Sequence, residues 1–200
     1  STLQIVLAGN SSTFTKDRVA GFGGAPNMGS DPRGRRHASD PWLQAGREAA
    51  GDTKALPRGR KLVVQIVETF GDKLSPTFVE ELDSLTLARS LDLPLPPVMI
   101  YGDDVSHIIT EEGIANLLLC RTPLEREQAI RGIAGYTDVG RGRDRRMVEE
   151  LRARKVIQRP EDLGIDPLDA NRSLLAARSI KDLMHWSGNH YDPPAKFRNW

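Results

Sequence analysis

Residues 61–70 read KLVVQIVETF and form the clearest β-strand pattern in this 200-residue chain. Four of these residues are Val or Ile, and the run is suited to burial on both faces of a sheet. Other short apolar runs predict strands at residues 3–7, 98–101 and 105–109. Helical patterns predict one helix that begins at Glu111 and three further helices at residues 123–135, 144–156 and 176–188. Strands that alternate with helices predict an α/β fold with a mainly parallel sheet flanked by helices.

Composition limits the class of protein. The chain carries 28 basic and 27 acidic residues, so its net charge of +1 argues against binding to nucleic acid through bulk charge. No apolar run approaches the roughly 18 residues of a membrane helix. A lone cysteine, Cys120, and the lack of a signal-peptide pattern favour a cytoplasmic protein. The four histidines show no metal-ligand spacing, so we expect no metal site.

A glycine-rich segment, GFGGAPNMG at residues 21–29, is the strongest local signal for a ligand. Successive backbone N–H groups in such a loop can hold a pyrophosphate, or the oxyanion that develops on a thioester carbonyl. A tight strand-to-helix turn is the structural alternative. The segment is not a dinucleotide fingerprint, because Pro26 stands where the third glycine belongs.

Two charged clusters offer further candidates. Arg33, Arg35, Arg36 and His37 closely follow the glycine segment and could attract phosphates or an acidic carrier protein, or could form a solvated loop. Glu111 and Glu112 follow a predicted strand. They could stabilise the dipole of the helix predicted there, or lie in a ligand crevice at the end of the strand.

Several longer motifs carry a resemblance to a known family. The chain closely resembles the alpha subunit of biotin-independent malonate decarboxylase, which is similar to the coenzyme A transferases. The motifs are LAGNSST (7–13), RVAGFGGAPNMG (18–29), DPRGRRH (31–37), GRKLVVQ (59–65), MIYGDD (99–104), TEEGIA (110–115), LAARS (175–179) and YDPPAKF (191–197).

The resemblance implies a transferase that converts an acetyl-S-carrier protein and malonate into malonyl-S-carrier protein and acetate. Residues 1–200 would be its C-terminal, coenzyme A transferase-like domain, with an N-terminal domain outside this chain. No cofactor would be tightly bound, because the thiol belongs to a phosphoribosyl-dephospho-coenzyme A group on the acyl carrier protein. Other decarboxylase subunits would be the remaining protein partners, without nucleic acid or membrane.

The resemblance also implies site residues. Coenzyme A transferases carry a nucleophilic glutamate where this chain has Gln4, and a carboxamide cannot take that role. Either malonate attacks the thioester directly, or another carboxylate such as Glu111 or Glu112 is the nucleophile. We expect four catalytic residues: Gln4, Gly23, Gly24 and Glu112. We expect substrate or coenzyme A contacts from Asn10, Ser11, Gly21, Phe22, Ala25, Asn27, Met28, Arg35, His37, Glu111 and Gly113.

A function of another class fits the same residues. The basic segment could belong to a non-catalytic module that docks an acidic carrier protein or nucleic acid. Binding of coenzyme A, or acyl exchange by the complete subunit, would separate this alternative from the transferase.

Overall fold

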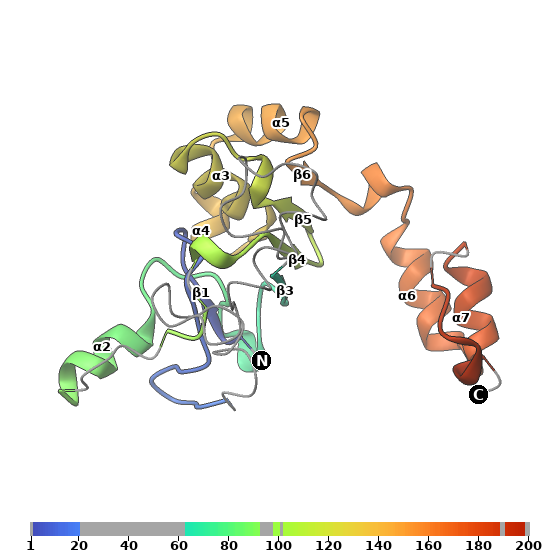
Figure 1. Cartoon of the computed structure of the whole chain (residues 1–200), viewed down its shortest axis with the longest axis horizontal. Coiled ribbons are helices and arrows are strands. Elements are labelled where there is room, and N and C mark those ends of the chain that lie inside the picture. The colour runs from blue at the N-terminus through green and yellow to red at the C-terminus, as the bar shows by residue number, and fades with distance from the viewer. Residues whose placement is uncertain (1, 21–62, 93–97, 101, 189–190, 199–200) are drawn as a thin grey trace, which may run out of the picture. The chain divides into compact units, whose positions relative to one another are not determined.

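The computed structural model describes residues 2–20, 63–92, 98–100, 102–188 and 191–198 (Figure 1). The chain divides into two compact units, Ser1–Gln158 and Arg159–Trp200. The first unit contains β1 (Gln4–Ile5), β2 (Ser11–Ser12), β3 (Val64–Ile66), α2 (Asp83–Ser90), β4 (His107–Thr110), β5 (Gly113–Asn116), α3 (Pro123–Ile133), α4 (Asp138–Arg141), α5 (Arg145–Ala153) and β6 (Ile157–Gln158). The second contains α6 (Pro167–Ala176) and α7 (Ile180–Trp186).

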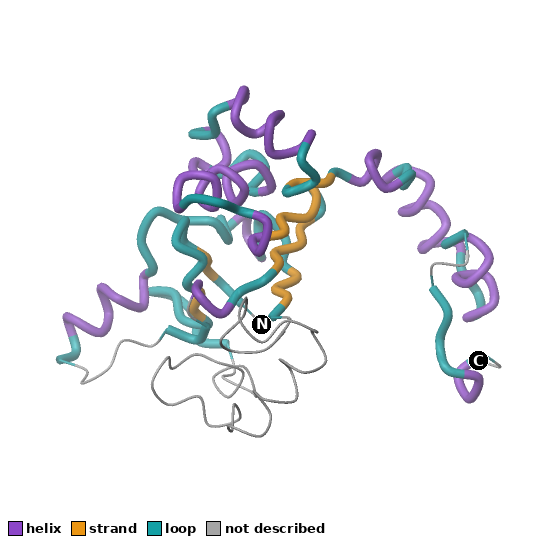
Figure 2. Tube along the Cα trace, turned by 45° about the horizontal axis from the view of Figure 1, so that its top comes forward, coloured by secondary structure: helices purple, strands orange, loops and turns teal. Residues whose placement is uncertain are grey.

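The strands of the first unit form two sheets (orange in Figure 2). One is the antiparallel pair β1–β2, and the other has four strands in the order β3-β4-β5-β6. In the larger sheet β3 and β4 are parallel, whereas β4–β5 and β5–β6 are antiparallel. A mixed fold of helices and strands is confirmed, but a mainly parallel sheet is not, because a tight turn joins β4 directly to the antiparallel β5.

The prediction of a helix that begins at Glu111 is wrong. Thr110 pairs with Gly113, so Glu111 and Glu112 form the two-residue turn of a β-hairpin. The Thr110 hydroxyl accepts the Glu112 N–H at 3.1 Å, which is also the geometry of a helix start. Here the chain reverses instead, and Ile108 and Ala115 are both buried on one face of the hairpin.

Three expected helices are present with changed lengths. α3 begins as expected, with the Thr122 hydroxyl accepting the Glu125 N–H at 3.1 Å and Pro123 in the first turn. α5 begins after Asp144, whose carboxylate accepts the Met147 N–H at 3.1 Å. In the second unit α7 covers only part of residues 176–188, and α6 precedes it as a separate helix that the apolar spacing did not predict.

The predicted strands are mostly shorter than their apolar runs. The run at 3–7 forms only β1, and the run at 98–101 contributes a single bridge between Ile100 and Ser11. β3 was expected to be buried on both faces. Its side chains alternate instead, with Val64 43% and Ile66 76% exposed and Gln65 buried between them.

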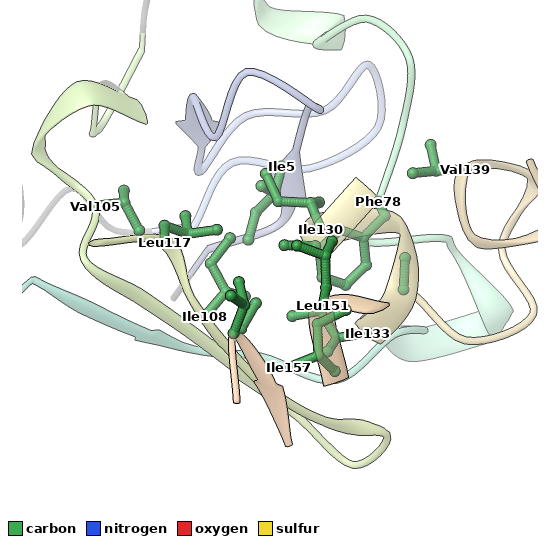
Figure 3. Close-up of a cluster of buried hydrophobic side chains, with 14 of the residues drawn as sticks. Ile5, Phe78, Val105, Ile108, Leu117, Ile130, Ile133, Val139, Leu151 and Ile157 are labelled. Carbon is green, nitrogen blue, oxygen red and sulfur yellow. The ribbon is translucent and has the colours of Figure 1, made fainter. Parts of the chain in front are cut away.

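A single apolar core joins the layers of the first unit. α3 lies against β5 and α5, and its Ile130 and Ile133 meet Leu151 and Ile157 in the core (Figure 3). Phe78 belongs to the same cluster and connects the β1 region with the larger sheet. Each large side chain buried in this way contributes about 1.5–3 kcal/mol relative to exposure.

An ion pair ties the start of α3 to the end of α5. The Glu125 carboxylate accepts from both terminal nitrogens of Arg154, at 2.6 and 3.2 Å, and from the Arg121 N–H at 2.7 Å. The hydrogen bonds from Arg154, followed by that from Arg121, lower the pKa of Glu125 from its ordinary value of 4.5.

We expect Glu125→Gln to lower stability at neutral pH and to matter less in acid. A carboxylate with a lowered pKa in the folded state stabilises the fold above its unfolded pKa and loses that effect as the pH falls through the folded pKa. The stability difference between wild type and variant should therefore shrink below about pH 4.5. Urea unfolding at pH 7, 5 and 3.5 measures this, and a difference independent of pH would contradict it.

None of the helices in the described part of the chain is long and apolar enough to cross a membrane.

Candidate functional site

Gln4 lies on β1 and is 7% exposed. Its side-chain oxygen accepts the backbone N–H of Asp83, the first residue of α2, at 2.9 Å. α2 needs this acceptor, because Leu82 at its N-cap position has no side chain that could accept a hydrogen bond. Gln4 therefore joins β1 to α2 through its side-chain oxygen. Its side-chain nitrogen is the atom that can donate hydrogen bonds.

Asn10 and Ser11 lie in the turn and strand that follow β1. The Asn10 side-chain oxygen accepts the Gly102 N–H at 2.8 Å. The Ser11 backbone bonds to Ile100 and Met99, at 2.9 and 2.7 Å, and Ser11 is fully buried. In this arrangement both residues connect the β1–β2 turn to the segment that ends at Gly102.

Glu111 lies in the β4–β5 turn and faces the chain that leaves β3. Both of its carboxylate oxygens accept the Thr69 N–H at 3.1 Å, and one also accepts the Thr69 hydroxyl. Glu111 and Glu112 are both exposed, and Gly113 is buried and paired with Thr110 in the hairpin. Both carboxylates of this turn therefore face solvent, and that of Glu111 is also hydrogen-bonded to Thr69.

Backbone hydrogen bonds connect the two groups of candidate residues. The Thr69 carbonyl accepts the Thr77 N–H at 2.9 Å, and the Thr77 carbonyl accepts the Ile5 N–H at 2.7 Å. Thr69, held by Glu111, is thus two hydrogen bonds away from the strand that carries Gln4. The structure places Gln4 and Glu111 in one connected framework and gives no direct contact between them.

The Glu111–Thr69 contact predicts a measurable coupling. We expect Glu111→Ala and Thr69→Val to be non-additive in the free energy of unfolding by about 1 kcal/mol, because the hydroxyl and the carboxylate are partners. The value is small for a charged hydrogen bond because Glu111 still contacts water. A double-mutant cycle in urea measures it, and additive effects would show that the contact contributes nothing.

The remaining predicted residues lie outside the described residues, and they stay predictions. They are Gly21, Phe22, Gly23, Gly24, Ala25, Asn27, Met28, Arg35 and His37, together with Arg33 and Arg36 of the basic segment.

Three residues beside the candidate residues were not predicted: Thr69, which Glu111 binds, Gly102, which donates to Asn10, and Arg126, which donates to the Gly102 carbonyl. Thr69 lies within the run at residues 61–70 and Gly102 within the MIYGDD motif, so both stand inside patterns already noted. Arg126 had no signal, because its position on α3 reads as an ordinary solvent-facing helix residue.

The described residues hold no group of three or more His, Cys, Asp or Glu side chains that could bind a metal ion. Cys120 is partly buried, and this burial raises the pKa of its thiol. A thiol with a raised pKa is present as the reactive thiolate to a smaller extent at neutral pH.

Comparison with known proteins identifies the family. The family described as "Malonate decarboxylase, alpha subunit, transporter" matches residues 1–200. An acetyl-S-ACP:malonate ACP transferase from Malonomonas rubra is 57% identical over the whole chain, which spans 36% of that protein.

Two solved structures are also similar. A chain of a Pseudomonas malonate decarboxylase hetero-tetramer in complex with malonate is 56% identical, with a TM-score of 0.72 over 100% of this chain and 36% of its own. The malonate decarboxylase alpha subunit of Acinetobacter baumannii is 50% identical, with a TM-score of 0.72 over 99% of this chain and 36% of its own. Because the family match covers every residue, the chain belongs to the malonate decarboxylase alpha subunit family.

Proposed function

We propose that the protein transfers a carrier-protein thiol between acyl groups, converting acetyl-S-carrier protein and malonate into malonyl-S-carrier protein and acetate. The observation that carries this proposal is the 57% identity, over the whole chain, to the acetyl-S-ACP:malonate ACP transferase. The chain spans 36% of that relative, so the activity belongs to a longer subunit in which this chain would be a C-terminal, coenzyme A transferase-like domain.

The proposed partners follow from the same likeness. They are an acyl carrier protein that bears a phosphoribosyl-dephospho-coenzyme A group, the other decarboxylase subunits, and malonate and acetate, all in the cytoplasm. The hetero-tetramer among the similar structures supports an assembly with other subunits, and its malonate supports the substrate. The basic residues Arg35 and His37 are the proposed contacts for the prosthetic group's phosphates.

Direct attack by malonate is the proposed mechanism. A malonate carboxylate oxygen attacks the acetyl thioester carbonyl, the carrier thiolate leaves, and an acetyl–malonyl anhydride forms. The thiolate then attacks the malonyl carbonyl, and acetate leaves. Backbone N–H groups near Gly23 and Gly24 would bind the oxyanion in both steps. Gln4 supports this route because its carboxamide is no nucleophile and its oxygen already accepts the Asp83 N–H.

The decisive test uses the full-length subunit with its carrier protein. The acetylated carrier is mixed with isotopically labelled malonate, and intact-mass spectrometry follows the carrier. We expect malonyl-S-carrier protein to form and acetate to be released in equal amounts. A subunit that binds the carrier but exchanges no acyl group would instead favour the non-catalytic docking module.

A further inference from the structure

Two turns of the first unit are in direct backbone contact. One is the turn at Ala8, Gly9 and Asn10 between β1 and β2, and the other is the single helical turn Gly102–Asp104. A Cβ atom on Gly102 would lie 1.8 Å from the Ala8 carbonyl oxygen, so the two backbones touch at this point. Asn10 strengthens the contact by accepting the Gly102 N–H at 2.8 Å.

Arg126 reaches this contact from α3. Its Nη2 donates to the Gly102 carbonyl and, at 3.3 Å, to the Val105 carbonyl. The same nitrogen lies beside Gly9, where an added Cβ would stand 3.3 Å from it. Gly102 is therefore held at both of its backbone polar groups, by Asn10 at the N–H and by Arg126 at the carbonyl.

The environment of Arg126 is that of a structural cation. Burial lowers the pKa of its guanidinium, although an arginine remains charged at any pH at which the protein is folded. Its acceptors are the backbone carbonyls of Gly102 and Val105, and the single nitrogen Nη2 donates to both. A buried charge of this kind is costly unless it is hydrogen-bonded, so its contacts to Gly102 and Val105 are what keep it in place.

We propose that Arg126 is a positioning residue of the transfer site. By fixing Gly102 against the Ala8–Asn10 turn, it sets the position of β1 and β2, and hence of Gln4 and Ser11, relative to α3. This inference rests on the proposed function, because those two residues are predicted to contact the reacting groups. A displacement of about 1 Å in such groups lowers the chemical rate far more than it lowers substrate binding.

The test compares three variants of the full-length subunit: Arg126→Met, Arg126→Lys and the control Arg154→Met. Arg154 also contacts α3 and donates to a backbone carbonyl, that of Leu119, at 3.3 Å, but among the described residues it makes no hydrogen bond or ion pair with either of the two turns. Acyl transfer gives kcat and the KM for malonate, thermal unfolding gives the loss of stability, and hydrogen exchange reports on the peptides that cover residues 5–12 and 102–105.

Arg126→Met is expected to lower kcat about tenfold with the KM for malonate within twofold, and to speed exchange in both peptides. Arg126→Lys should recover part of kcat, because an ammonium can bind one of the two carbonyls. Arg154→Met should lower the unfolding temperature yet keep kcat near that of wild type.

Three results would overturn the inference: a loss of kcat in Arg154→Met as large as in Arg126→Met, a loss that appears in KM instead of kcat, or unchanged exchange in the two peptides. An inactive wild-type subunit would instead remove the proposed function. The exchange comparison would then still decide whether Arg126 fixes the turn.

Discussion

Gly102→Ala is expected to destabilise the first unit by more than ~3 kcal/mol, above the usual range for an overpacked side chain. The added Cβ would stand 1.8 Å from the Ala8 carbonyl oxygen and 2.8 Å from its carbonyl carbon. These neighbours are backbone atoms, so no change of rotamer can relieve the clash. The two turns must separate, and the hydrogen bonds from Gly102 to Asn10 and from Arg126 to Gly102 are then lost.

Gly71→Ala is the matched control for this prediction. A Cβ on Gly71 would meet one atom within 4 Å, the Ser75 carbonyl oxygen at 3.8 Å, which is an ordinary contact. We expect this variant to change stability by less than ~1 kcal/mol. Urea unfolding of both variants measures the difference. Similar stabilities for the two would show that the turns are not in contact in the folded protein.

The contact at Gly102 illustrates where sequence reasoning stops. The helix start at Thr122 and Pro123 was predictable, because the cap, the proline and the first turn lie within four residues of one another. Gly102 and Asn10 are 92 residues apart, and nothing in the MIYGDD motif indicates that its glycine must meet another backbone. Requirements of this kind depend on tertiary contacts that a local pattern does not contain.

The helix predicted at the TEEG segment, residues 110–113, is wrong for a related reason. A threonine followed by two glutamates favours a helix start, and the Thr110 hydroxyl does accept the Glu112 N–H as a cap would. Contacts from elsewhere in the chain decide in favour of the hairpin. The Glu111 carboxylate binds Thr69, and the Thr110 hydroxyl donates to the Ile133 carbonyl at 2.8 Å.

In the candidate site, too, the tertiary contacts of the predicted residues could not be derived from the sequence. Gln4 was predicted from the resemblance to coenzyme A transferases and Glu111 from the TEEGIA motif, and the structure connects the two through Thr69, Thr77 and Ile5. Their structural contacts were not predictable from the sequence. Gln4 caps a helix that begins 79 residues later, and Glu111 accepts the N–H of Thr69 in the segment after β3. Gln4 and Glu111 stay predictions as site residues, whereas the fold shows which neighbours they hold.

Gln4→Glu is expected to lower kcat/KM for malonate about thirtyfold while the fold is kept. A glutamate oxygen can accept the same Asp83 N–H, at a helix N-terminus where negative charge is favoured. On the proposed function, in which Gln4 contacts the reacting groups, the new charge would stand near malonate's two negative charges. Repulsion of ~2 kcal/mol is the order expected for separated charges at an effective dielectric constant of about 20. Steady-state transfer by the full-length subunit, with malonate varied, measures the change.

Gln4→Met separates charge from hydrogen bonding. Methionine matches glutamine in length but offers only a weak acceptor, so this variant loses the cap of α2, at a cost of about 1 kcal/mol, without adding a charge. If repulsion is the cause, Gln4→Met keeps a KM for malonate near that of wild type. An equal rise in KM for both variants would show that loss of the amide N–H donor, which both substitutions remove, and not charge, weakens malonate binding.

The same proteins test the order of bond formation. Incubated with acetyl-S-carrier protein and then borohydride, wild type is expected to show no modified residue in mass spectrometry, since direct attack by malonate forms no acyl-enzyme. Gln4→Glu places a carboxylate at the position that the resemblance assigns to the nucleophile of coenzyme A transferases, and an adduct at position 4 would agree with that assignment. A stoichiometric adduct in wild type, above all on the solvent-facing Glu112, would replace direct attack with a two-step route through an acyl-glutamyl anhydride.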